Sequence, residues 1–363
     1  MGKGNVVNSE PENEIQDSQQ ATFQPKHLNR LKLAVVMLTV AGIALFVYFV
    51  YSVGMSELID GIGRFGLEGF AVILVFYLAR MVVRAFAWKL SVFEPYRLKF
   101  TDALSAFVIG EAMSNIIPLG ILISGTAKAV VVRDRLPLVV GMSSVATENL
   151  FYSLTTSIFL IIGSVSLLLY FPLESGWEIT IVVLIAGIVA LLIFLALMVM
   201  RQWHFASESC EWLYKRGYLR GLLEDGRMDV RLFENLIFGF YRQHPNRFLP
   251  ICLYEAAFHL LGVAEVWYIL SRLSSGYPSV MTAFLLESVS RLITILFKLI
   301  PFVIGVDEAG SKFVGDVVAL SAGIGITIAV IRKGRVLFWT AIGLVLLIKR
   351  GLSLRQIAAL KES

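Results

Sequence analysis

Residues 67–93 read LEGFAVILVFYLARMVVRAFAWKLSVF, an apolar run that is long enough to cross a lipid bilayer and that still holds Arg80 and Arg84. Runs of about 20 or more apolar residues, the length that spans a bilayer, recur along the chain. The sequence therefore predicts an all-α, polytopic integral membrane protein with about six full spans. The other five expected spans are residues 33–53, 137–171, 179–200, 248–273 and 318–348.

The composition supports the same class of protein. Of the 363 residues, 57% are hydrophobic and only 16% are charged, and the mean hydropathy is +0.76. Soluble domains carry about one-quarter charged residues, so these values exclude an ordinary soluble enzyme. The two cysteines, Cys210 and Cys252, lie far apart and in no metal-ligand spacing, so we expect neither a disulfide framework nor a metal site.

The positions of Lys and Arg predict the orientation of the chain in the membrane. They gather in residues 1–32, 201–247 and 349–363, whereas the opposite loops hold only Arg64 and Arg272. Because basic loops stay in the cytoplasm, we expect a plasma-membrane protein with both termini cytoplasmic. The net charge of +5 thus reflects membrane orientation, and we expect no nucleic-acid partner.

The chain is expected to form one membrane domain at 31–350, between a disordered cytoplasmic tail at 1–30 and a short cytoplasmic tail at 351–363. Within it, residues 201–247 form a cytoplasmic or interfacial loop. Residues 229–241 place apolar side chains on one helical face, which is typical of an interfacial helix; a helix packed on the membrane bundle is the alternative. That face consists of Leu232, Phe233, Leu236, Ile237 and Phe240.

Two further apolar stretches are interrupted by proline. Residues 102–132 contain Pro118 and residues 279–319 contain Pro301. Proline leaves backbone groups unpaired, so each break must lie inside the protein or face a water-filled cavity. We expect a re-entrant helical hairpin at each stretch, with a kinked full-length helix as the alternative. With six full crossings, the first hairpin would enter from the cytoplasm and the second from outside.

The two interrupted stretches indicate an internal repeat. Each has an Ile-Pro pair followed by a glycine and a lysine, and each lies between two spans. Because the preceding spans run in opposite directions, the two units would be inverted copies, as in many transporters. The matching residues are Asn115, Pro118, Gly125 and Lys128 in the first unit, and Lys298, Pro301, Gly310 and Lys312 in the second.

Many charged residues lie within the apolar segments. A charged side chain at the bilayer centre costs about 2.5–3.5 kcal/mol on insertion scales, so these residues must face partners, water or an anionic ligand. The basic ones are Arg80, Arg84, Lys89, Lys128, Arg291, Lys298, Lys312, Arg332, Lys333 and Arg335, and the acidic ones are Glu111, Glu148, Glu255, Glu265, Glu287, Asp307 and Glu308.

Spacing suggests roles for some of them. Glu287 and Arg291 are four residues apart on one helix, which predicts a structural ion pair. Arg80 and Arg84 share a helical face and repel each other unless a negative group lies between them. Either carboxylates of a neighbouring span or the phosphate of a lipid headgroup would serve, since the guanidinium group binds both in bidentate fashion.

Other charges lie near the proline breaks or stand apart. Glu111 and Asn115 share a helical face and point toward the first break, where we expect a substrate site. Asp307 and Glu308 open the second half-helix and are expected to cap it, a role that is compatible with substrate binding. Beyond these, Glu148 and Asn149 have no basic neighbour on their own helix, which makes Glu148 a candidate for proton coupling, whereas His259 is expected only to pack.

Several catalytic motifs are absent from the sequence. It contains no phosphate-binding loop ending in Lys-Ser/Thr, no His-Glu-x-x-His and no Gly-x-Ser-x-Gly. We therefore expect neither ATP hydrolysis, zinc proteolysis nor serine hydrolysis, and no cofactor. Whether the chain is an enzyme of another kind stays open.

At its broken segments the sequence resembles the flippase-like family typified by the transmembrane region of lysylphosphatidylglycerol synthase, which includes YbhN-like and hopanoid-associated membrane proteins. The resemblance covers nearly the whole chain after residue 30. It implies a membrane protein that handles lipids. The residues that carry it are Asn115, Pro118, Gly125, Glu148, Pro301, Gly305, Glu308, Gly310, Arg332, Arg335, Trp339 and Gly343.

The sequence also departs from that family. Thr126 stands where the family usually has an acidic residue, and a second glycine pair is reduced to Ile304 and Gly305. These differences bear on which headgroup is handled. Because the last expected span is followed only by a short tail, without a soluble aminoacyl-transferase domain, we expect no lipid lysylation by this chain alone.

These observations favour a lipid translocator with a polar groove between two inverted units. Two alternatives stay open: an intramembrane enzyme that modifies a lipid headgroup with Glu148 or Glu308 as base, and an accessory subunit that partners a lipid-synthesis enzyme. The residues expected to bind the lipid are Arg80, Arg84, Glu111, Asn115, Pro118, Gly125, Lys128, Glu148, Asn149, Pro301, Gly305, Glu308, Arg332 and Arg335. The sequence does not predict the oligomeric state.

Overall fold

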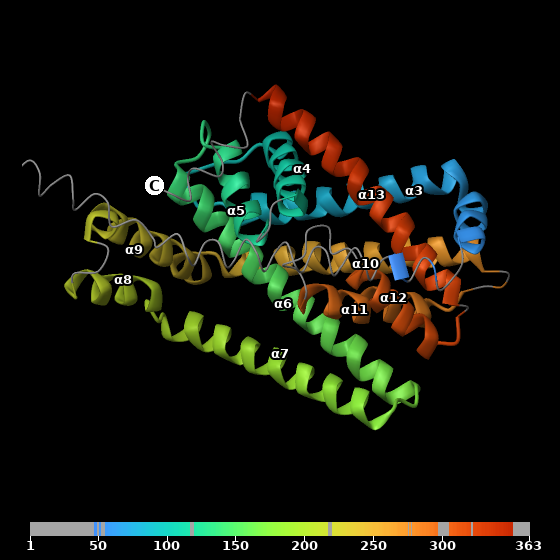
Figure 1. Ribbon diagram of the computed structural model, residues 1–363. Helices are drawn as coiled ribbons and strands as arrows, with labels where there is room; N and C mark the ends of the chain where they lie inside the picture. The colour runs from blue at the N-terminus through green and yellow to red at the C-terminus, as the bar shows by residue number, and fades with distance from the viewer. Residues whose placement is uncertain are drawn as a thin grey trace, which may run out of the picture.

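A computed structural model describes residues 47–48, 51, 55–116, 120–216, 220–274, 276, 278–296, 305–320 and 322–350. Throughout these residues the regular structure is helical (Figure 1), which confirms the predicted all-α class. Both expected tails, most of the first expected span, Pro118, Lys298 and Pro301 lie outside the described residues.

Long helices occupy the remaining expected spans. Four of the described helices, at residues 58–90, 138–170, 175–201 and 245–273, are long and apolar enough to cross a membrane. The last long helix has 28 residues but carries charges in its middle. In the first, Gly66 adopts a positive φ of 67° and breaks the helix just before the apolar run at Leu67. The long helices are α3 (Met55–Leu90), α6 (Leu138–Tyr170), α7 (Ser175–Arg201), α10 (Phe248–Leu273) and α13 (Ala322–Lys349).

The two interrupted stretches each form a pair of shorter helices. In each pair the two helices pack against each other, which a kinked full-length helix would not allow. Both stretches therefore form helical hairpins and the kinked alternative is wrong, while re-entry of the hairpins into the membrane stays a prediction. The first hairpin consists of α4 (Phe100–Ile116) and α5 (Gly120–Val131), and the second of α11 (Val280–Leu296) and α12 (Val306–Val317).

The helix contacts of the bundle are symmetric. When α3, α4, α5 and α6 are exchanged for α10, α11, α12 and α13, each of the main contacts between these eight helices maps onto another observed contact. For example, α13 packs on α4 just as α6 packs on α11, and α3 packs on its own counterpart α10 (Figure 1). These eight helices thus form two four-helix units with the same pattern of contacts.

The two units are inverted relative to each other. Arg272 at the end of α10 lies 3.9 Å from Glu68, just after the break in α3 at Gly66, and Arg247 before α10 lies 2.5 Å from Glu94 after α3. These ion pairs at both ends show that α3 and α10 run antiparallel. Since each hairpin follows the C-terminal end of one of these helices, the two hairpins enter the bundle from opposite ends.

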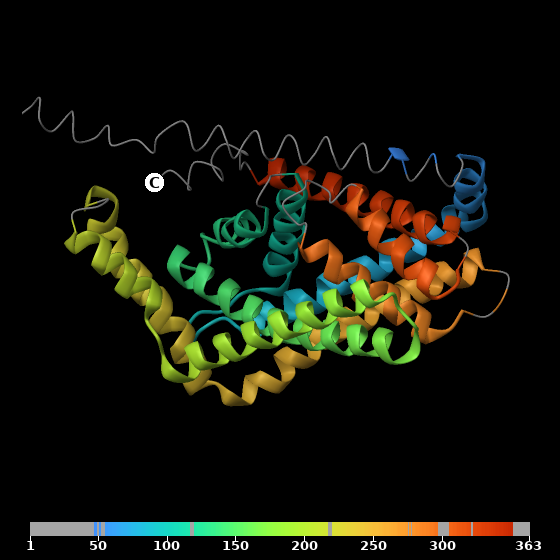
Figure 2. The same ribbon diagram turned by 60° about the horizontal axis from the view of Figure 1, so that its bottom comes forward.

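Helix α7 lies between the two units, and its only buried side chain is Ile181, as expected of a helix that faces lipid. The segment that follows α7 leaves the bundle at one end (Figure 2). The C-terminal part of α9 packs on the bundle, where Phe240 contacts the rings of Phe93 and Phe151, whereas Leu232 is exposed. The packed alternative therefore holds for this end of the helix. The segment contains α8 (Phe205–Lys215), α9 (Arg220–Gln243) and the short η1 (Pro245–Arg247).

Candidate functional site

Four arginines and two glutamates form a continuous buried network, which we call the arginine cluster. They come from α3, α10, α11 and α13, so both inverted units contribute. The members are Arg80, Glu265, Glu287, Arg291, Arg332 and Arg335.

Every carboxylate oxygen of the arginine cluster contacts a guanidinium group. Arg80 Nη2 donates to Glu287 Oε1 at 3.2 Å, and Arg332 Nη2 donates to Glu287 Oε2 at 2.7 Å. Arg291 also pairs with Glu287. Glu265 contacts Arg80 Nη1 at 3.3 Å and pairs with Arg335. The ion pair of Glu287 and Arg291, which their spacing predicted, is thus part of a larger network.

Positive charge exceeds negative charge in this network. Among the described residues, four guanidinium groups share the two carboxylates Glu265 and Glu287. Asp307 at the start of α12 is the next carboxylate near Arg332, and counting it still leaves the arginines in excess. A surplus of buried positive charge is costly unless an anion neutralises it, so the cluster has the charge of an anion-binding site.

The surrounding side chains fit closely around the arginine cluster. A Cβ atom on Gly262 of α10 would lie 2.4 Å from Glu287 Oε1 and 3.2 Å from Arg80 Cζ, so only glycine allows this approach. The ring of Phe258 lies 4.2 Å from Arg80 Cζ, and the ring of Tyr77 lies 4.2 Å from Arg335 Cζ. These cation–π contacts partly offset the desolvation of the guanidinium groups.

One helical turn along α3, Arg84 belongs to a second group, which we call the carboxylate cluster: Arg84, Glu148, Asn149 and Glu255. Arg84 Nε donates to Glu148 Oε1 at 2.9 Å and lies 3.5 Å from Glu255 Oε2. Its Nη2 atom donates to Asn149 Oδ1 at 3.3 Å. Glu148 and Glu255 are completely buried.

The two clusters show which negative groups lie beside Arg80 and Arg84, the neighbouring arginines of α3. Carboxylates of neighbouring helices pair with both arginines, and the two side chains contact different carboxylates. Glu148 lacks a basic neighbour on its own helix, as the sequence indicated, but α3 supplies one in Arg84. The packing expectation for His259 agrees with its burial between aromatic rings, where Nε2 lies 3.1 Å from Thr156 Oγ1.

The residues expected at the first proline break lie near these clusters but make separate contacts. Glu111 accepts a hydrogen bond from the Tyr77 hydroxyl at 3.3 Å, and Asn115 donates to Thr340 Oγ1 at 3.1 Å. Lys128 is buried, with its ammonium 3.5 Å from the centre of the Phe107 ring. Gly125 lies on α5 and faces α6.

At the second break the geometry shows a capping role. Gly305, with a φ of 83°, donates its backbone N–H to Glu308 Oε2 at 2.7 Å, and Glu308 Oε1 lies 3.1 Å from Lys333 Nζ. Glu308 therefore caps α12 and ties it to α13. Lys312 pairs at 2.6 Å with Asp316 on the partly exposed side of the same helix, away from the arginine cluster.

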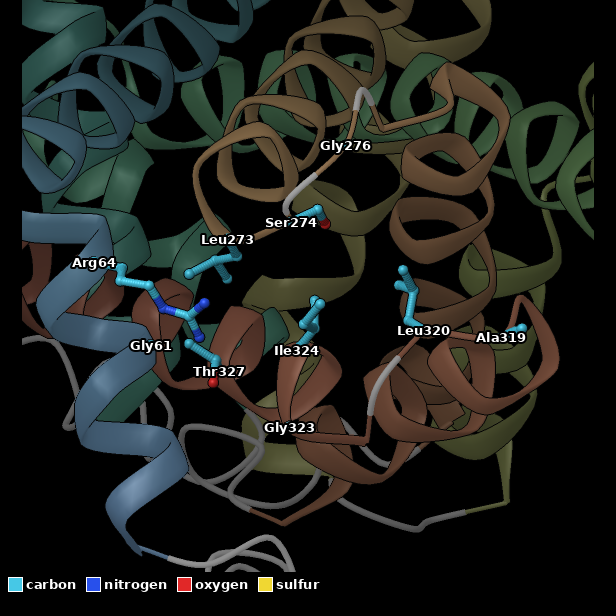
Figure 3. A pocket seen from close by; sticks show the side chains of 10 residues that line it. All are labelled: Gly61, Arg64, Leu273, Ser274, Gly276, Ala319, Leu320, Gly323, Ile324 and Thr327. Carbon is cyan, nitrogen blue, oxygen red and sulfur yellow. The ribbon is translucent and has the colours of Figure 1, made fainter.

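Two open cavities lie at opposite ends of α13. The first, of about 410 Å³, lies between α3, the end of α10 and the start of α13; among the described residues that line it, Arg64 alone is charged. Figure 3 shows the Arg64 guanidinium directed toward Thr327, which precedes Arg332 by five residues, roughly 7.5 Å along the helix. The second, of about 360 Å³, lies between residues 130–135, Asp102 and Arg350.

Sequence reasoning missed the residues that separate the charges: Tyr77, Tyr152, Phe258 and Gly262. In an apolar run these look like ordinary core residues. Their helical spacing to a charged residue was the available signal, since Tyr152 follows Glu148 by four residues and Phe258 follows Glu255 by three. In the part of the chain that the structure describes, no group of His, Cys, Asp and Glu could hold a metal ion.

Comparison with protein families identifies a match over most of the chain. The family described as lysylphosphatidylglycerol synthase TM region matches residues 31–348, which includes both hairpins and both charge clusters. Comparisons with curated proteins and with solved structures found no match.

Proposed function

The chain belongs to the lysylphosphatidylglycerol synthase TM region family, and from this membership and its buried charges we propose that it translocates a membrane lipid with an anionic or zwitterionic headgroup. The family and the apolar helices make it a membrane protein related to lipids. The translocation step and the nature of the headgroup are the content of the proposal.

The surplus of positive charge in the arginine cluster is the observation that carries this proposal. A phosphate would neutralise the surplus and accept bidentate hydrogen bonds from the guanidinium groups. Arg291 and Arg332 keep 14% and 12% of their side-chain surface exposed, so both remain reachable. A neutral lipid would leave the charges uncompensated and should be a poor substrate.

The symmetry of the bundle supports a transport role. Inverted repeats place substrate sites at their interface and allow the site to open to either side of the membrane. The arginine cluster lies at such an interface, because α3 and α10 are counterparts that pack on each other. The cavity at Arg64 lies at one end of α13 and the cavity at Arg350 at the other, where a headgroup would enter and leave.

In this proposal the phosphate binds Arg80, Arg332 and Arg335, and the carboxylate cluster with Arg84 forms the adjacent part of the groove. Glu111, Asn115, Glu148 and Asn149 would then face an amine or a sugar of the headgroup, and Lys128 would lie beside its phosphate. The end of the bundle that carries Arg135, Arg247 and Arg350 would face the cytoplasm of a cell with this protein in its plasma membrane.

The test is headgroup accessibility in proteoliposomes. Fluorescent anionic, zwitterionic and isoprenoid-phosphate lipids are loaded into vesicles with native protein, Arg332→Gln or Lys312→Gln, and a membrane-impermeant quencher is added. We expect native protein and Lys312→Gln to expose inner-leaflet lipid faster than empty vesicles, and Arg332→Gln to lose at least tenfold in rate. Lys312 is a matched control because its ion pair lies outside the arginine cluster.

Rates equal to those of empty vesicles for every lipid, with and without a proton gradient, would overturn autonomous translocation. Analysis of the lipids after incubation separates the enzyme alternative, which predicts a chemically altered headgroup. Glu308 is a poor base for such chemistry, because its carboxylate already binds the Gly305 amide and Lys333. An accessory subunit would show neither activity and would keep its partner when Arg332 is replaced.

A further inference from the structure

The carboxylate cluster contains an acidic side chain whose hydrogen bonding is incomplete. Glu255 is completely buried on α10, yet neither of its carboxyl oxygens accepts a hydrogen bond, although Oε2 lies 3.5 Å from Arg84 Nε, and Glu148 Oε2 also accepts none. An ionised carboxylate in an apolar bundle without hydrogen bonds is strongly disfavoured. The contrast on the same helix is Glu265, whose two oxygens each contact a guanidinium group.

Glu255 and Glu148 lie against the same atom of Arg84, whose Nε is 2.9 Å from Glu148 Oε1 and 3.5 Å from Glu255 Oε2. Two carboxyl groups can form a hydrogen bond only when one of them holds a proton, and like charges in contact favour such sharing. We therefore propose that Glu148 and Glu255 hold one proton between them, and that the protein binds and releases this proton during transport. The binding and release of the proton during transport rests on the proposed translocator function.

The neighbouring charges fit a single shared proton. Arg84 from α3 lies within ion-pair distance of both carboxyl groups, so one proton on the pair gives these three groups a net charge of zero. Lys128 from α5 is the other cation near Glu255, and Glu111 from α4 lies near Lys128 and Arg84. On α10 itself the Cys252 thiol also lies near Glu255.

The charges around the pair can compensate for the loss of the proton. In the protonated state the Glu255 carboxyl donates to Glu148, which keeps its two hydrogen bonds from Arg84. When the proton is released, both carboxylates are ionised; Arg84 lies within ion-pair distance of both, and Lys128 nearby offsets the added negative charge.

Infrared spectroscopy of the full chain in lipid vesicles tests the proton directly. Between about pH 6 and pH 9 exposed carboxyl groups stay ionised, so a carboxylic-acid carbonyl band in this range reports a buried protonated group. We expect this band in native protein and in Glu308→Gln, and its loss in Glu255→Gln. Glu308 is the matched control because it is equally buried but paired with Lys333.

Thermal unfolding gives a second readout. Glutamine has the shape and charge of a protonated glutamate, so Glu255→Gln should keep the native unfolding temperature, whereas an ionised Glu255 paired with Arg84 predicts a clear loss. A missing band in native protein, or its persistence in folded Glu255→Gln, would overturn the shared proton.

Transport assays separate this proposal from the translocator function. We expect a pH gradient to change the lipid translocation rate of native protein at least threefold and to leave Glu255→Gln unaffected. A band in native protein without any lipid movement would support the proton site and reject the translocator. Lipid movement that ignores the gradient in native protein would reject proton coupling.

Discussion

The two inverted units share their helix packing and differ in the charges that they present to the interior. On α6 of the first unit the buried charge is Glu148, whereas α13, its counterpart, carries Arg332 and Arg335. The result is one cluster in which arginines outnumber carboxylates and another in which a single arginine meets two carboxylates. The two units thus share one packing pattern, whereas their different charges give the two clusters opposite charge balances.

The largest expected effect comes from removing the carboxylate at the centre of the arginine cluster. Glu287→Gln leaves Arg80, Arg291 and Arg332 without their shared partner, and loss of one partner from a buried ion pair costs about 3–5 kcal/mol. Thermal unfolding in detergent should show this loss. Arg332→Gln should cost much less, because Glu287 keeps two guanidinium partners. The opposite order would contradict a surplus of positive charge.

A smaller effect is expected from the packing that encloses the same cluster. Gly262→Ala places a methyl group against Glu287 Oε1 and should reduce the free energy of unfolding by about 1–3 kcal/mol, the usual cost of overpacking a core. Gly187→Ala on α7 is the matched control, since its Cβ would meet nothing within 4 Å and alanine favours the helix. Equal unfolding temperatures for the two variants would show that α10 does not hold this pair in place.

Much of this architecture could be predicted from the sequence, because it depends on local patterns. The length of the apolar run at 248–273 fixed α10, and the proline breaks located both hairpins even though Pro118 and Pro301 lie outside the described residues. Lys and Arg placement then required the two units to be inverted. Each of these patterns can be read within one segment or from the number of membrane crossings between two segments. No knowledge of side-chain packing was needed.

The partners of the buried charges could be predicted only where they are local. The pair of Glu287 and Arg291 follows from a spacing of four residues, but Arg84 meets Glu148 and Glu255 across 64 and 171 positions of the chain. Such contacts depend on how α3, α6 and α10 are rotated about their axes. Hydrophobic periodicity defines that rotation poorly in a bundle whose lipid-facing and core-facing sides are both apolar.

The smallest expected effect concerns an ion pair outside both clusters. It tests whether burial determines how much an ion pair contributes to stability. Lys312 and Asp316 are four residues apart on α12, with 29% and 48% of their side chains exposed, so Asp316→Asn should cost about 0.3–0.5 kcal/mol and less at high salt. Unfolding of native and variant protein at low and high salt measures this. A loss of unfolding free energy as large as that of Glu287→Gln would mean that Lys312 belongs to the buried network. The surplus of positive charge would then extend along α12 toward the second proline break.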